Sequence, residues 1–220
     1  MGVTVLAGDA PAQEESGREV KRTALALVTL AACAPAAPPL PRYGSVPAFS
    51  MRDQSARAIG DPDFRGSVWV ADFIFTSCAG VCPLLTRRMA EVARWADSEK
   101  IAPAKFRLAS FTVDPARDTP ERLAAYAKEN AIDGARWSLL TGEPTAVERA
   151  IVAGFKIAVS KEKPEPGERA DTEDGFAILH GTKLILIDGA GSVRGYFDSD
   201  PEGLRALETA AAQLIAHGGT

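Results

Sequence analysis

The chain contains few cysteines and few histidines. Of its 220 residues, three are cysteine and two are histidine. Three cysteines are too few for a small domain stabilised mainly by disulfides, so that class of protein is excluded. A site that needs an imidazole has only His180 and His217 available, which makes both of them worth close attention.

Two further features are missing: a basic stretch interleaved with aromatic residues, and a long apolar run. The formal net charge is −4, and without a basic patch this weak acidity argues against nucleic acid as a partner. The apolar run over residues 24–32 is much shorter than the roughly 20 residues that a membrane-spanning helix needs. With 46% hydrophobic and 25% charged residues, the composition is that of one globular domain with a tail.

The first 33 residues have the layout of a bacterial export signal. Lys21 and Arg22 precede the short apolar run, which ends in Leu30-Ala31-Ala32-Cys33. This ending resembles a lipoprotein processing site, at which Cys33 becomes the lipidated first residue of the mature chain. The alternative is an ordinary signal in which Cys33 is incidental. Residues 1–33 are therefore interpreted as a signal region. The protein is expected in the bacterial cell envelope, anchored by lipid to the inner membrane and facing the periplasm.

The remaining chain divides into a tether and a domain. Residues 34–45 are rich in proline and alanine and are expected to form an extended tether. The domain is expected over residues 46–217. Its apolar patterns predict strands at 67–75, 106–114, 137–140, 155–159, 176–179, 183–187 and 193–197, and helices at 83–95, 118–130, 144–153 and 201–216. Strands that alternate with helices and are covered on both faces predict an α/β thioredoxin-like sandwich, with a central mixed sheet flanked by helices.

Cys78 and Cys82 lie between an apolar strand and a predicted helix, and Pro83 follows at the first turn of that helix. The spacing is one residue longer than the C-x-x-C redox motif of thioredoxin-like proteins. The extra residue widens the loop, so that both sulfurs can point at one ion. Unpaired N–H groups at a helix start favour a thiolate, and we expect Cys82 to occupy that position. Thiolates are also soft metal ligands that favour Cu(I).

Two sulfurs form an incomplete metal site, and His180 is the candidate third ligand. It follows the predicted strand 176–179 and comes shortly after the charged segment 161–175. An imidazole at a strand end can swing onto a metal, although a lone histidine is more often exposed or hydrogen-bonded. His217 lies in the last turn of the terminal helix, where a cation offsets the helix dipole. It is interpreted as structural or merely exposed.

Three motifs, in order along the chain, resemble the Sco/SenC family of copper-binding cytochrome oxidase assembly proteins. The first is Cys78-x-x-x-Cys82-Pro83 after Phe73-Ile74-Phe75-Thr76. The second runs from Thr112 to Pro120 and is followed by Leu123 and Tyr126. The third is Leu179-His180-Gly181-Thr182, followed by residues 184–188 and Gly191. Together the motifs and their surroundings cover about residues 45–215, which is nearly the whole expected mature chain.

The resemblance implies a thioredoxin-like fold and a site for copper, as Cu(I), Cu(II) or both, with Cys78, Cys82 and His180 as its ligands. It also implies a copper chaperone that assists assembly of the CuA site of cytochrome c oxidase, with the oxidase subunit that carries this site as its partner. Other periplasmic copper chaperones are expected partners too. A thioredoxin-like reductant completes the set, because the two cysteines must be reduced to hold the metal. The chain departs from the family at residues 79–81, where an acidic or polar residue is frequent, and at Gly181, where serine is common.

Other functions of the same cysteines stay open. A thiol–disulfide oxidoreductase would use Cys78 and Cys82 as a redox disulfide and would not need His180. Structural zinc needs four ligands, and only three convincing ones remain once Cys33 is lipidated. A peroxidase would need a low-pKa cysteine in a different local pattern, and a buried structural disulfide is disfavoured in a glycine-containing loop. We therefore expect a binding protein rather than an enzyme, with thiol–disulfide reductase activity as the alternative.

Two carboxylates lie where the predicted strand 106–114 ends and the next helix begins. Asp114 is the last residue of that strand, and Asp118 belongs to the start of the helix. For both, a structural role is the simpler interpretation. Asp114 is also a candidate for contact with a copper ligand or with the partner that loads the metal.

Overall fold

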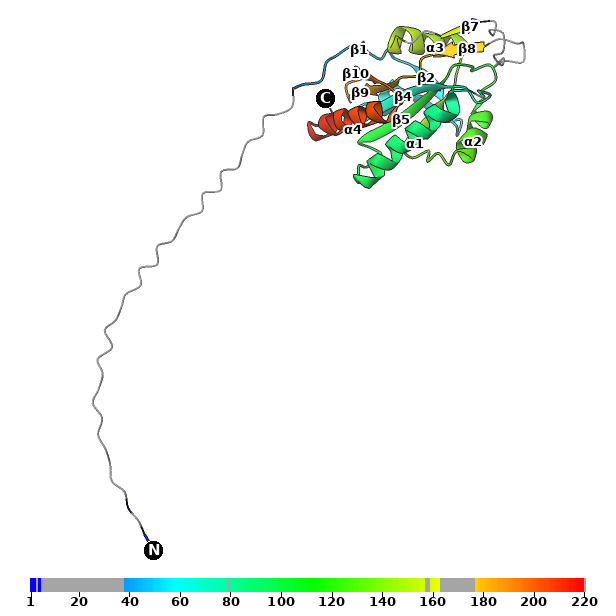
Figure 1. Cartoon of the computed structure of the whole chain (residues 1–220). Coiled ribbons are helices and arrows are strands. Elements are labelled where there is room, and N and C mark those ends of the chain that lie inside the picture. Colours follow the sequence, from blue (N-terminus) through cyan, green and yellow to red (C-terminus); the bar gives the residue numbers. More distant parts are fainter. Residues whose placement is uncertain (3, 5–37, 79, 157–158, 163–176, 220) are drawn as a thin grey trace. The chain divides into compact units, whose positions relative to one another are not determined.

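A six-stranded mixed sheet forms the centre of the domain (Figure 1). The computed structural model describes residues 1–2, 4, 38–78, 80–156, 159–162 and 177–219. In spatial order the strands are β1 (Gly44–Ser45), β10 (Ser192–Phe197), β9 (Leu184–Ile187), β4 (Val68–Ile74), β5 (Phe106–Thr112) and β6 (Trp137–Leu140). Strands β4, β5 and β6 are parallel, whereas β9 is antiparallel to β4 and to β10. The predicted mixed sheet is therefore confirmed.

Helices cover both faces of this sheet (Figure 1). On one face lie α1 (Cys82–Ser98), α2 (Pro120–Glu129) and α4 (Pro201–Ala216), whose apolar side chains pack on Val70, Leu108 and Leu186. On the other face lie α3 (Pro144–Arg149) with its π-helical continuation Ala150–Gly154, the hairpin of β2 (Ser50–Arg52) and β3 (Ala58–Gly60), and the short 3-10 helix Asp61–Phe64. All seven residues of β4 are buried, as expected for a strand covered on both faces.

The strand directions give the sheet two distinct ends. Strands β4, β5 and β6 all finish at one end, which we call the carboxyl edge. Strand β10 also finishes there because it is antiparallel to β9, which is itself antiparallel to β4. Strand β1 pairs with Val193 and Ser192, the first residues of β10, so it lies at the opposite edge. Helix α4 starts after β10 and runs back to that opposite edge, where the Gly189 N–H donates to the Gly219 carbonyl at 2.6 Å.

The outer side of β6 is occupied by residues from the β2 region. The Gln54 amide donates to the Trp137 carbonyl at 3.0 Å and accepts from the Leu139 N–H at 2.8 Å. Arg52 and Thr141 exchange two backbone hydrogen bonds just beyond the strand end. These contacts satisfy backbone groups that an edge strand otherwise presents to solvent.

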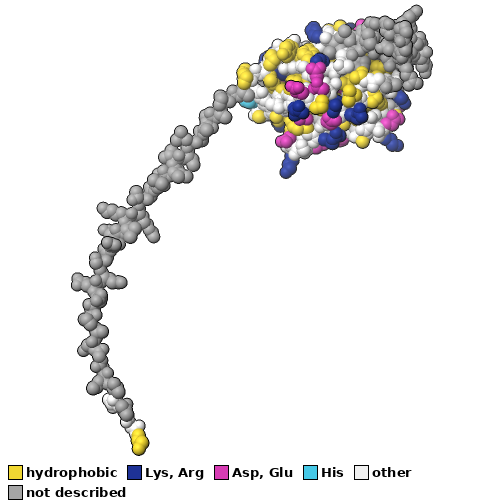
Figure 2. Space-filling view, in the orientation of Figure 1, with side chains coloured by type: hydrophobic (Ala, Val, Ile, Leu, Met, Phe, Trp, Pro, Cys, Tyr) yellow, Lys and Arg dark blue, Asp and Glu magenta, His cyan; other side chains and the backbone are white. Residues whose placement is uncertain are grey.

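The predicted strand 155–159 is wrong at its first two residues. Phe155 ends the π-helical segment as a fully buried ring, and Lys156 has a φ of 58°, which turns the chain. Strand β7 (Val159–Glu162) begins only after that turn and pairs with β8 (Ala177–His180) in a separate two-stranded sheet. The charged segment lies largely outside the described residues. On the face of the domain drawn in Figure 2, basic and acidic side chains are intermixed.

Aromatic packing under α3 allows a direct test of the fold. Phe155 is buried. The centroid of its ring lies 5.1 Å from the ring centroid of Phe111 and 5.3 Å from that of Phe73. Phe155→Ala is expected to lower the free energy of unfolding by about 3–5 kcal/mol, because it leaves a cavity among these rings. Urea denaturation should give this loss, whereas Val152→Ala, which alters an exposed side chain, should change stability by less than about 0.5 kcal/mol. Equal effects of the two substitutions would contradict this packing.

Candidate metal centre

Cys78 and Cys82 lie side by side at the carboxyl edge, where the loop after β4 enters α1. Cys82 is the first residue of α1 and is 1% exposed, while Cys78 lies in the loop and is half-buried. The backbone N–H of Cys82 donates to the sulfur of Cys78 at 3.4 Å. This N–H is one of the donors at a helix start that lack a partner within the helix. The N–H group at the helix start therefore stabilises negative charge on the sulfur of Cys78.

The thiol of Cys82 is in a different environment from that of Cys78. Its hydrogen bond with the side chain of Cys78, followed by burial, raises the pKa of Cys82 well above the usual range of a thiol. The expectation that the helix start favours a thiolate at Cys82 is therefore wrong. The reason is that Cys82 points into the core beside Leu85 and Met89, where an unpaired charge is costly.

Asp118, for which the sequence suggested a structural role at the start of α2, fixes the loop before Cys78. Asp118 is 1% exposed and accepts hydrogen bonds from the Thr76 hydroxyl at 2.5 Å and from the Thr76 N–H at 3.1 Å. It also accepts from the Thr112 hydroxyl at the end of β5, at 2.5 Å. Arg122 donates to the Thr76 hydroxyl at 3.0 Å. Asp118 thus connects the cysteine loop to β5 and to the start of α2.

Asp114, the carboxylate considered from the sequence, is oriented by other partners. It is buried, its carboxylate forms an ion pair with Arg117, and its N–H donates to the Thr112 hydroxyl at 3.0 Å. Both carboxylates therefore organise the loop after β5, and Asp118 also links it through Thr76 to the loop that carries Cys78.

A third buried carboxylate lies near the cysteines. Asp72 on β4 is fully buried and accepts a hydrogen bond from the Ser110 hydroxyl, which in turn accepts from the Trp137 indole. Its charge contributes to the raised pKa of Cys82 and of Tyr126. The sequence carried a signal for this residue, because Asp72 is the one charged residue inside the apolar run 67–75.

Tyr126 and Thr86 add buried hydroxyl groups to the same region. Their hydroxyl oxygens are 2.6 Å apart, between α2 and α1. Burial raises the pKa of Tyr126 to about 12, and the charges of nearby Cys82 and Asp72 act in the same direction. The hydroxyl of Tyr126 therefore stays protonated at neutral pH and can donate a hydrogen bond.

The backbone of His180 ends β8, which leads to the carboxyl edge of the sheet. Strand β9 starts at Leu184, and Ile185 pairs with Ala71 towards the end of β4. Because only three residues separate His180 from that start, the topology brings the end of β8 to the edge that carries the cysteine loop. Among the side chains that the structure describes, no group of three His, Cys, Asp or Glu could hold a metal ion. Of His180, the structure describes the backbone alone.

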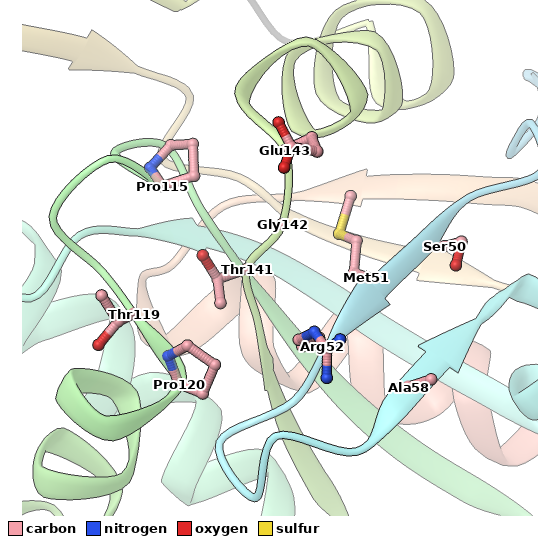
Figure 3. A pocket seen from close by; sticks show the side chains of 10 residues that line it. All are labelled: Ser50, Met51, Arg52, Ala58, Pro115, Thr119, Pro120, Thr141, Gly142 and Glu143. Carbon is pink, nitrogen blue, oxygen red and sulfur yellow. The ribbon is translucent and has the colours of Figure 1, made fainter.

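A cavity of about 480 Å³ opens beside the loop after β5 (Figure 3). Pro115, Thr119 and Pro120 line one side of it, and Met51 and Arg52 of β2 line the other. The cavity lies at the carboxyl edge on the flank of the loop that contains Asp114 and Asp118. Neither Cys78 nor Cys82 lines it.

The two cysteines are expected to differ in reactivity. In the reduced protein, a brief exposure to iodoacetamide at neutral pH should modify Cys78 at least about tenfold faster than Cys82, because Cys82 is buried and its pKa is raised. Peptide mapping by mass spectrometry measures both rates in one sample. Cys82→Ser should retain the fast reaction, and unfolding in urea should remove the difference. Faster modification of Cys82 in the folded protein would contradict the assignment.

Asp118 is expected to make stability depend on pH. Burial raises its pKa above the ordinary value of 3.8, while hydrogen bonds from Thr112 and Thr76 oppose this shift. The folded protein then holds a proton that the unfolded chain has already lost, so the free energy of unfolding decreases as pH rises from 3.8 through the raised pKa. Asp118→Asn should flatten this decrease in denaturant titrations from about pH 4 to 7. Glu129→Gln, at an exposed position of α2, serves as the control, and an unchanged slope in Asp118→Asn would count against the raised pKa.

Comparison with known proteins places this chain in a family. The family model described as SCO1/SenC matches residues 40–214. A SCO1/SenC family lipoprotein from Bacillus anthracis str. Ames is similar in structure, with a TM-score of 0.64 and 32% identity over 76% of this chain and 95% of that chain. BsSco has a TM-score of 0.63 and 25% identity over 80% and 99% of the two chains. It is a member of the Sco family of cytochrome c oxidase assembly proteins in which a disulfide switch was identified.

A third structure agrees with this chain in fold. Copper-bound ScoI of Bradyrhizobium japonicum has a TM-score of 0.62 and 22% identity over 77% of this chain and 99% of that chain. The sandwich is therefore the thioredoxin-like fold predicted from the sequence. None of the helices in the described ranges has the length and apolarity that a membrane-spanning helix needs. Because the family model matches most of this chain, the chain belongs to the SCO1/SenC family.

Proposed function

We propose that this protein is a copper chaperone that holds copper through Cys78, Cys82 and His180 and delivers it for assembly of the CuA site of cytochrome c oxidase. The observation that carries the proposal is the placement of two thiols at one helix start, where the backbone nitrogen of Cys82 lies 3.4 Å from the sulfur of Cys78. Membership of a family with a copper-bound relative supports copper as the cargo.

The chemistry of the donors suits copper in particular. Two thiolates and one imidazole are soft to intermediate ligands, which favour Cu(I) over hard cations such as magnesium or calcium. Both thiols must lose their protons to bind the metal, so uptake releases protons and is favoured by rising pH. A site with three protein ligands leaves room for the approach of an acceptor's own ligand, which a transfer protein needs.

We further propose that the protein is anchored to the bacterial inner membrane by lipid at Cys33 and faces the periplasm. The signal layout of residues 1–33 and the lipoprotein relative from Bacillus anthracis support this location. Its partners are then the oxidase subunit that carries the CuA site, another periplasmic copper chaperone as donor, and a thioredoxin-like reductant. The reductant is needed because the periplasm is oxidising and a disulfide between Cys78 and Cys82 would remove both sulfur ligands.

Copper titration of the reduced protein tests the ligand set. The wild-type protein should bind one copper ion, and Cys78→Ser, Cys82→Ser and His180→Ala should each lower the affinity at least about a hundredfold, because each removes a direct ligand. The absorption spectrum of the Cu(II) form should change in all three variants. His217→Ala is the matched control, since it alters the second histidine of the chain, which is exposed directly after the last residue of α4. Full affinity and an unchanged spectrum in His180→Ala would rule out the three-ligand site.

A second function, reduction of the acceptor's cysteines, is favoured by the contrast between the two thiols. The half-buried Cys78, which accepts an N–H, suits attack on an external disulfide, and the buried Cys82 beside it suits the resolving step. The disulfide switch identified in BsSco agrees with such a role. Electron exchange does not need an imidazole. The test is therefore the variant His180→Ala. If it reduces an acceptor disulfide at the wild-type rate but does not support CuA assembly, then copper delivery and not thiol reduction is the physiological role.

A further inference from the structure

The segment before the first core strand is fastened to the domain. We call residues 38–45 the strap. The Gln213 amide donates to the Pro38 carbonyl at 2.8 Å, and Arg194 donates to the carbonyls of Leu40 at 2.8 Å and Pro41 at 3.0 Å. Leu40 also packs against the hydrophobic core. The extended tether expected from the sequence is thus held along the domain from Pro38 onwards.

A buried ion pair supplies the fastening. Arg194 is 6% exposed and pairs at 2.8 Å with Asp188, which is fully buried. The second oxygen of Asp188 accepts from the N–H groups of Ala190 and Ser192. The remaining N–H groups of the guanidinium point at the strap. If the strap moved away, these buried donors would lose their acceptors, and each such loss costs free energy. The strap is therefore a fixed part of the domain.

The strap lies at the edge of the sheet that is farthest from the cysteines. The Tyr43 N–H donates to the Val193 carbonyl at 2.9 Å, and β1 pairs with the first residues of β10, opposite the carboxyl edge. The seven residues of β4 separate the two edges, a distance of about 23 Å at the rise of a strand. Figure 1 shows the same arrangement, with β1 and the C-terminus near one end of the sheet and the start of α1 towards the other.

The exposed side chains of the strap match a membrane surface. Tyr43 is 55% exposed although it is a large apolar side chain, and its ring contacts that of Tyr196 edge-on at 5.7 Å. Arg42 beside it is exposed. Tyrosine is enriched at the headgroup level of membranes, and an arginine near the surface is attracted by anionic lipids.

We propose that the strap orients the domain on the membrane, with the strap edge against anionic lipid headgroups and the cysteine loop directed away from them. The inference rests on the proposed lipid anchor at Cys33. Residues 34–37 are all that separates Cys33 from the strap, so the lipidated residue lies within about 18 Å of Pro38. The short link keeps the strap near the bilayer, and the exposed Tyr43 and Arg42 then favour the strap edge over the cysteine edge as the surface that meets the headgroups. Copper is then presented to a water-exposed part of its acceptor.

Energy transfer from the protein to a headgroup dye measures this orientation. The lipidated full-length protein is placed in vesicles of phosphatidylethanolamine and phosphatidylglycerol that carry the dye. In Cys82→Ser, Cys78 is the one thiol available for a donor label; in a second variant with Cys78→Ser and Cys82→Ser, His217→Cys places the label near the strap edge. Energy transfer to the headgroup dye should be much stronger from the label at position 217 than from the label at position 78.

Two alterations connect the orientation to the strap. Insertion of about ten glycine and serine residues after Ala37 lengthens the link by up to about 35 Å without touching the domain. It should abolish the difference in energy transfer between the two labelled positions.

The paired change Arg194→Met with Asp188→Asn removes the ion pair that holds the strap, without leaving a buried charge. It should speed hydrogen exchange of the Tyr43 amide at least about tenfold, whereas Arg94→Met, at an exposed position of α1, should leave the exchange unchanged.

The outcomes separate this proposal from the proposed function. Equal transfer from positions 78 and 217 in protein that is retained on vesicles would overturn the orientation alone. Failure of the protein to stay on the vesicles would overturn the anchor, and the orientation with it. Copper titration of the unlabelled wild-type protein is independent of both results and continues to test the ligand set.

Discussion

The parallel pairing of β4 with β5 is the constraint on which the site depends. Because Ile74 pairs with Thr112, the loops that follow the two strands leave the sheet at the same edge and at the same level. The carboxylate of Asp118 then accepts hydrogen bonds from both loops, through Thr76 and Thr112. A shift of register by one residue would move these groups to opposite faces. The position of Cys78 is thus set by backbone pairing first and by a single carboxylate second.

The two sulfurs share one helix start but have unequal surroundings. Cys78 receives the N–H of Cys82 and is open to solvent, whereas Cys82 is enclosed by core side chains above the buried Asp72. Copper held by both sulfurs, as we propose, would replace both protons and so remove this inequality, and a disulfide would remove it by joining the sulfurs. Both processes would then compete for the same pair of cysteines.

The sequence was sufficient for features with a regular period or a recognisable motif. The continuous apolar run 67–75 predicted β4, and Thr119 with Pro120 predicted the start of α2, where the Thr119 hydroxyl accepts the Arg122 N–H at 3.3 Å. The roles of Asp118 and of Arg194 could not be predicted, because each depends on partners more than 40 residues away that only the folded chain brings near. The helix start was located correctly, but its effect on the cysteines was assigned to the wrong sulfur, since burial of Cys82 is a tertiary property.

Closure of the sheet at both sides has a consequence for crowding. A protein held on a bilayer is concentrated in two dimensions, so copies meet repeatedly in similar orientations. An open sheet edge would then be a template for strand addition between neighbours. Here the side chain of Gln54 occupies the backbone groups of β6, and at the other side the two-residue β1 is too short to offer a continuous ladder. In the membrane-anchored protein that we propose, these two protected sides would disfavour strand pairing between neighbouring molecules.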